Sequence, residues 1–186
     1  IIFAVKPQVM DNVVPFYASF SATTVFMSIA AGRTLSYFEN ILGKEASIVR
    51  VMPNTPAAVQ KGISCAISNT KVSASQKEIC NDLMRAVGEL YWLDNESQID
   101  AVTAVSGSGP AYVFLLAECL AKVGQKLGLP KHLAERLGRV TIYGSGELLH
   151  QSGEDLVTLR KNVTSPGGTT EAALKILMKS SNIKTK

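Results

Sequence analysis

Residues 24–56 read TVFMSIAAGRTLSYFENILGKEASIVRVMPNTP and contain a strand–helix–strand pattern. The apolar runs at residues 24–31 and 48–52 predict two strands. Between them, residues 35–42 predict a short helix that Gly43 ends. Strands that alternate with helices are typical of a mostly parallel sheet covered on both faces.

The same alternation extends outward from this stretch and then stops. We predict further strands at residues 1–5, 63–68 and 90–93, and helices at residues 8–19 and 73–87, the latter with Ser73 as its N-cap. Beyond residue 94 we predict helices only, at residues 97–105, 111–127, 131–150, 154–162 and 170–178. The sequence therefore predicts an α/β part over residues 1–94 and an all-α part over residues 95–186.

The first five residues, IIFAV, predict a strand buried on both faces. Natural domains seldom begin inside such a strand, so we expect the start of the domain to lie upstream of this chain.

Composition excludes several classes of protein. The formal net charge is +4 and no long Lys/Arg block is present, which argues against a nucleic-acid partner. The three cysteines form no C-x-x-C pair, which argues against a zinc site or a disulfide framework and fits a reducing cytoplasm. We expect these cysteines to be buried small apolar residues. The longest apolar run, residues 111–117, is too short to span a bilayer, so we expect no membrane partner and no metal.

Constrained loops follow three of the predicted strands. They read A-V-K-P at residues 4–7, A-A-G at residues 30–32 and P-N-T-P at residues 53–56. Ligands of open α/β sheets bind beyond the carboxyl ends of the strands, so three such loops at one edge indicate a ligand site. Taken singly, each loop is equally explained as a strand exit, a close-packing position or an ordinary turn.

Two glycine-rich segments lie in the helical half. Residues 106–112, S-G-S-G-P-A-Y, fail the dinucleotide fingerprint because Tyr112 occupies the third glycine position and a helix precedes them; we interpret them as a flexible joint. Residues 162–170, N-V-T-S-P-G-G-T-T, place two glycines and two threonines before a helix. Free N–H groups there can hold an anion such as a carboxylate, although a plain N-cap after a turn explains the pattern equally well.

Together these motifs resemble the pyrroline-5-carboxylate reductases. The match comprises A-V-K-P, S-I-A-A-G at residues 28–32, M-P-N-T-P at residues 52–56, S-G-S-G-P-A-Y and N-V-T-S-P-G-G-T-T, in the family's order and spacing. The resemblance implies a partial Rossmann-type sheet followed by a helical dimerisation and substrate-binding domain. It also implies NADPH- or NADH-dependent reduction of 1-pyrroline-5-carboxylate to L-proline, by a homodimer that can form a larger ring.

The resemblance further implies roles for individual residues. The cofactor would be bound by Ala4, Val5, Lys6, Pro7, Ala30, Ala31, Gly32 and Asn54. The substrate would be bound, across the dimer, by Asn162, Ser165, Gly167, Gly168, Thr169 and Thr170. Thr170 would also be catalytic, as a proton donor to the imine nitrogen.

The sequence departs from the family at both ends. The family's first strand with its Gly-rich phosphate loop is missing, and so is its C-terminal end, so we expect a truncated form. Two alternatives stay open: a non-catalytic dimerising fragment, or a related reductase such as a β-hydroxyacid dehydrogenase.

Overall fold

The computed structural model describes residues 1–180, so the end of the basic tail lies outside the described residues. The chain divides into a first compact unit, Ile1–Phe114, and a second, Leu115–Lys186. This division falls later than residue 94, and the assignment of separate functional domains at residue 94 stays a prediction.

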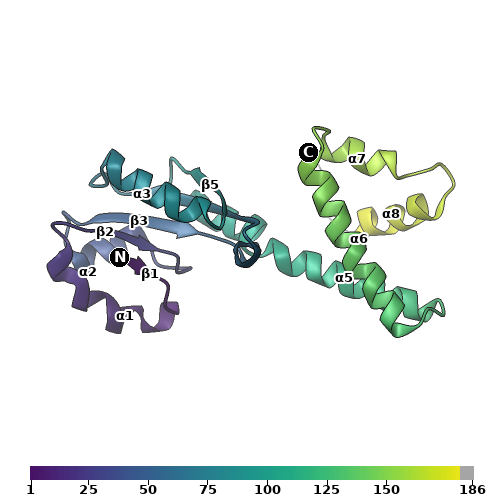
Figure 1. Ribbon diagram of the computed structural model, residues 1–186, viewed down its shortest axis with the longest axis horizontal. Helices are drawn as coiled ribbons and strands as arrows, with labels where there is room; N and C mark the ends of the chain where they lie inside the picture. Colours follow the sequence, from purple (N-terminus) through teal and green to yellow (C-terminus); the bar gives the residue numbers. More distant parts are fainter. Residues whose placement is uncertain (181–186) are drawn as a thin grey trace. The chain divides into compact units, whose positions relative to one another are not determined.

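The first unit is built on a five-stranded sheet whose strands lie in chain order (Figure 1). The strands are β1 (Ile2–Phe3), β2 (Val25–Ser28), β3 (Ser47–Met52), β4 (Gly62–Ser68) and β5 (Gly88–Trp92). The pairs β1–β2, β2–β3 and β4–β5 are parallel, which confirms the predicted α/β class with a Rossmann-like set of parallel strands.

The prediction of parallel strands is wrong at one position, because β3 and β4 pair antiparallel. The connection between them is only the short 3-10 helix η3 (Thr55–Val59) and a left-handed Gln60. A parallel return needs a crossover of a dozen or more residues, whereas a short connection reverses the chain.

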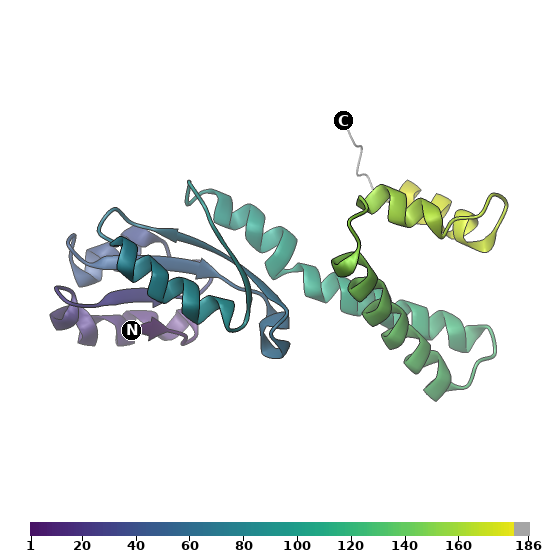
Figure 2. The ribbon, with the colours of Figure 1, turned by 45° about the horizontal axis from the view of Figure 1, so that its top comes forward.

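Helices cover both faces of the sheet (Figure 2). On one face, α2 (Leu35–Leu42) and the N-terminal helical turns enclose Phe3, Phe26 and Phe38, whose rings stack 5.7–5.8 Å apart. On the other face, α3 (Ala74–Arg85) packs Cys80 and Met84 against the sheet. The predicted burial of both faces is confirmed.

Helix caps predicted from the sequence are also present. The hydroxyl of Ser73 accepts a hydrogen bond from the Gln76 N–H, and the Gln76 side chain returns one to the Ser73 N–H, which completes a capping box. Thr34 caps α2 in the same way by accepting from the N–H of Tyr37.

The N-terminal segment differs from its prediction in two respects. Of the first strand only Phe3 is buried, while Ile2 is 49% exposed, because within the described residues β1 pairs with β2 alone. The predicted helix over residues 8–19 is three short pieces: η1 (Pro7–Val9), α1 (Met10–Val13) and η2 (Val14–Phe20). Pro15 has no N–H to donate, which prevents one continuous α-helix.

The predicted flexible joint at residues 106–112 is helical. A π-helical turn, η4 (Thr103–Gly107), continues α4 (Gln98–Val102) directly into α5 (Gly109–Lys126). The Ser108 N–H donates to the Thr103 carbonyl at 2.8 Å, so no loop separates the helices.

The second unit consists of helices. It contains the greater part of α5, then α6 (Lys131–Gln151), α7 (Leu156–Asn162) and α8 (Thr169–Ser180). Helices α5 and α6 approach closely at Gly138, where an added Cβ would lie 2.8 Å from the carbonyl oxygen of Ala117. Small residues at this crossing therefore set the helix separation.

The continuous helix Gln98–Lys126 exposes most of its apolar surface. It is long and apolar enough, by length and composition alone, to cross a membrane, and only 6% of its most apolar window is buried. Cys119 on this helix is exposed, which corrects the prediction that every cysteine is buried; Cys80 is buried and Cys65 half-buried. An apolar face of this extent on a chain that also carries a folded α/β unit indicates an interface.

Candidate functional site

Three loops meet at one edge of the sheet, because β1, β2 and β3 run parallel. Residues 4–7 follow β1, residues 30–32 follow β2, and Asn54 follows β3. The eight residues predicted to bind the cofactor thus all lie at the carboxyl ends of parallel strands, where ligands of such sheets bind.

Arg33 ties the first two loops together. Its guanidinium donates to the Pro7 carbonyl oxygen at 2.8 Å and to the Asp11 carboxylate at 3.1 Å, and it lies over the ring of Tyr37. Burial and the hydrogen bond from its hydroxyl to Asp11 raise the pKa of Tyr37 to about 12. The cluster therefore stays charged at Arg33 and Asp11 and neutral at Tyr37 near neutral pH.

Asn54 has a structural contact as well as a free donor. Its side-chain oxygen accepts the Ile63 N–H at 3.0 Å, which fixes the start of β4. Within the described residues no hydrogen bond is recorded for its amide nitrogen, so that group is available to a ligand.

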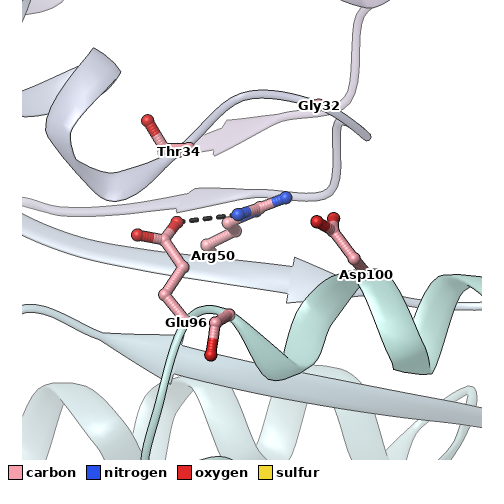
Figure 3. A pocket seen from close by; sticks show the side chains of 6 residues that line it. Gly32, Thr34, Arg50, Glu96 and Asp100 are labelled. Atoms are coloured by element: carbon pink, nitrogen blue, oxygen red, sulfur yellow. Dashed lines mark hydrogen bonds and ion pairs between the residues drawn. The ribbon is translucent and has the colours of Figure 1, made fainter.

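A polar cavity of about 420 Å³ opens beside the second loop (Figure 3). Its lining residues are Gly32, Thr34, Arg50, Glu96, Ser97 and Asp100. Gly32 adopts a positive φ of 74°, a conformation that favours glycine. The Arg50 guanidinium pairs with the Glu96 carboxylate at 2.7 Å, and Asp100 on α4 points toward the same guanidinium.

The predicted anion-binding turn belongs to the second unit. Gly167 has a positive φ of 73°, and the Gly168 N–H bonds the Ser165 carbonyl oxygen at 3.1 Å. Thr169 and Thr170 open α8, and no hydrogen bond is recorded for their N–H groups within the described residues. Asn162 donates its side-chain amide to Glu154, so it braces the turn from α7.

A carboxylate already occupies part of this turn. The Gly167 N–H donates to Oε2 of Glu171 at 2.8 Å. This bond, with a second contact to Lys175, lowers the pKa of Glu171. The Glu171 oxygen stands where a ligand's carboxylate oxygen would accept, so the turn is able to bind a carboxylate group.

The sequence missed Arg33, Arg50, Glu96 and Asp100. Each is a single charged residue whose role depends on partners distant in the chain, such as Glu96 with Arg50 and Leu35. Only the charge of Arg50 inside an otherwise apolar strand could have drawn attention to it.

Parallel strands with ligand loops at their carboxyl edge, followed by a helical unit, define a Rossmann-type α/β protein with a helical extension. A family model described as pyrroline-5-carboxylate reductase dimerisation matches residues 96–185. The pyrroline-5-carboxylate reductase of Pseudomonas aeruginosa is 46% identical over 176 residues, covering 94% of this chain and 64% of that protein. The one of Corynebacterium melassecola is 39% identical, covering 97% of this chain and 68% of that protein.

Solved structures agree with these sequences. The Coxiella burnetii pyrroline-5-carboxylate reductase superimposes with a TM-score of 0.88 at 40% identity, covering 96% of this chain and 67% of that one. The Plasmodium falciparum pyrroline carboxylate reductase with NADP bound gives 0.87 at 36% identity, covering 97% and 71%. The chain therefore belongs to the pyrroline-5-carboxylate reductase family, and it spans about two thirds of the length of these relatives.

Proposed function

We propose that this protein takes part in proline biosynthesis as a pyrroline-5-carboxylate reductase. It reduces 1-pyrroline-5-carboxylate to L-proline with NADPH or NADH. Family membership supports the reaction, and one observation in this chain carries the site: the conserved-type turn at residues 165–170 already holds a carboxylate on the Gly167 N–H.

The turn suits the chemistry of a cyclic imine acid. When bound, the nicotinamide cofactor supplies a hydride to the imine carbon, and the electron pair of the C=N bond moves to nitrogen, which takes a proton. Gly167, Gly168 and Thr169 offer backbone N–H groups for the substrate carboxylate, with Ser165 and Asn162 bracing the turn. Thr170 directs its hydroxyl at the imine nitrogen, where it donates or relays the proton.

The cofactor lies along the edge of the sheet. Ala4, Val5, Lys6 and Pro7 form one side of its site, and Ala30, Ala31 and Gly32 form the other, with small side chains that let a flat ring approach the backbone. The free amide of Asn54 donates to the carboxamide end of the ring. The NADP bound to the Plasmodium falciparum relative supports this choice of cofactor.

A second copy of the chain covers the apolar face of α5. The match of residues 96–185 to a dimerisation model supports a homodimer, and dimers assemble further into a ring. In the dimer the turn at residues 165–170 serves the sheet edge of the partner copy. The free cysteines support a cytoplasmic location, without nucleic-acid or membrane partners.

The test is a coupled assay of NADPH oxidation and proline formation with 1-pyrroline-5-carboxylate. We expect one proline for each NADPH consumed. A stable dimer with no turnover would instead favour a non-catalytic dimerising module, and turnover of a β-hydroxyacid without turnover of the imine would favour the related dehydrogenases.

A further inference from the structure

Glu96 connects three elements of the first unit through one carboxylate. Its Oε1 accepts the Leu35 N–H at 2.8 Å and the Arg50 Nη1 at 2.7 Å (Figure 3). Leu35 begins α2, Arg50 lies on β3, and Glu96 stands just before α4. The carboxylate therefore fastens the helix that follows the A-A-G loop to the centre of the sheet.

The surroundings of this contact make it strong. The Arg50 side chain is only 7% exposed and the Glu96 side chain 28% exposed, so water screens their attraction less than at the surface. The Leu35 N–H is one of the donors that the first turn of a helix leaves without an intrahelical partner. A negative charge at that end of the helix is favourable in addition.

The loop itself has few other anchors. Ala31, Gly32 and Thr34 are exposed, and the positive φ of Gly32 lets the chain turn sharply there. Arg33 fixes the loop toward Pro7 and Asp11, and the Leu35 N–H fixes its other end on Glu96. Loss of the second anchor would leave the loop held from one side.

We infer that Glu96 is a positioning residue that holds the A-A-G loop in its cofactor-binding conformation. This inference rests on the proposed function, because the loop is taken as part of the cofactor site. Glu96 is also the first residue that the dimerisation model matches, so the same contact joins the start of that region to the cofactor loop.

The test compares Glu96→Gln and Glu96→Ala with a control, Glu45→Gln, which removes an exposed ion pair to Lys71. Charge-assisted hydrogen bonds contribute about 1.5–3 kcal/mol. We therefore expect the KM for NADPH to rise on the order of tenfold in Glu96→Ala, with a smaller rise in Glu96→Gln. The KM for the imine and kcat should stay within about twofold of wild type in both.

Hydrogen exchange gives a second readout if Glu96→Ala does not fold. In Glu96→Gln the Leu35 amide should exchange faster, while amides in the interior of α2 keep their protection. Wild-type values for the NADPH KM and for Leu35 exchange would overturn the inference, as would equal losses in NADPH KM, imine KM and kcat. Wild-type protein without imine turnover would instead refute the proposed function, and the Leu35 exchange would still report on the anchor.

Discussion

Thr170 is the residue whose chemistry matters most. It opens α8 beside the Gly167–Gly168 turn, so its hydroxyl can serve the substrate or merely stabilise the helix. Loss of a positioned proton donor typically costs about 10²- to 10⁴-fold in rate, whereas loss of a helix cap costs about 1 kcal/mol of stability. We expect Thr170→Val to lower kcat at least a hundredfold, on the order of the lower limit of that range.

The control for this substitution is Thr158→Val. Thr158 also carries its hydroxyl in the first turn of a helix, where it bonds the Asp155 carboxylate. Thr158→Val should lower the melting temperature with little effect on turnover. If Thr170→Val behaves in the same manner, Thr170 is a cap, and its catalytic role is wrong.

Glu171 gives the turn a pH-dependent contribution to stability. The Gly167 N–H, and after it Lys175, lowers the pKa of this carboxylate in the folded protein. A lowered pKa stabilises the fold above the ordinary glutamate value of about 4.3, and that stabilisation is lost as the pH falls through the lowered value. The melting-temperature difference between wild type and Glu171→Gln should thus be constant near neutral pH and shrink in acid.

Because Glu171 is exposed, this difference should be small and should decrease with added salt. Glu147→Gln, on the exposed side of α6, measures the general effect of removing one helix carboxylate. A wild-type advantage that grows in acid would contradict the observed hydrogen bond.

Single residues also show the limit of prediction from sequence. The glycines and threonines of residues 162–170 were found because a turn followed by a helix start has a local pattern. The roles of Arg33 and Glu96 come from partners 26 and 61 positions away, and no local pattern records such contacts.

At the scale of elements, periodicity and caps predicted most helices and strands. The helix over residues 35–42 is observed with the same bounds, and Ser73 caps α3 as predicted. Chain direction was wrong for β4, because the length of the β3–β4 connection decides it and the apolar pattern does not. The joint at residues 106–112 was wrong because glycines were interpreted as a break, whereas a π-helical turn accommodates them.

The crossing of α5 and α6 depends on one glycine. A Cβ at Gly138 would meet the Ala117 backbone, whereas a Cβ at Gly144, on the same helix, meets nothing within 4 Å. Overpacking typically costs about 1–3 kcal/mol, so we expect Gly138→Ala to lower the free energy of unfolding by that amount. Gly144→Ala should raise it by about 0.5–1 kcal/mol, because alanine favours the helix. Equal effects in urea denaturation would show that the crossing is not tightly packed.

For the whole molecule, the exposed apolar face of α5 predicts a dimer. Val123 is 52% exposed on that face, and Gln125 lies two positions further on. A charge buried in an interface without a partner is costly, so Val123→Glu should shift the protein toward monomer in sedimentation at micromolar concentration. Gln125→Glu adds the same charge at a polar position and should leave the dimer intact. A wild-type monomer would contradict the proposed dimer.

The central claim is that the protein reduces an imine whose carboxylate it holds on the turn at residues 165–170. The most direct measurement compares NADPH oxidation with 1-pyrroline-5-carboxylate and with 1-pyrroline, which has the same ring without the carboxylate. Backbone donors left unpaired by the smaller substrate should lower its kcat/KM by two or more orders of magnitude, on the order of 10²-fold at least. Equal kcat/KM for the two imines, or no oxidation with either, would contradict the account.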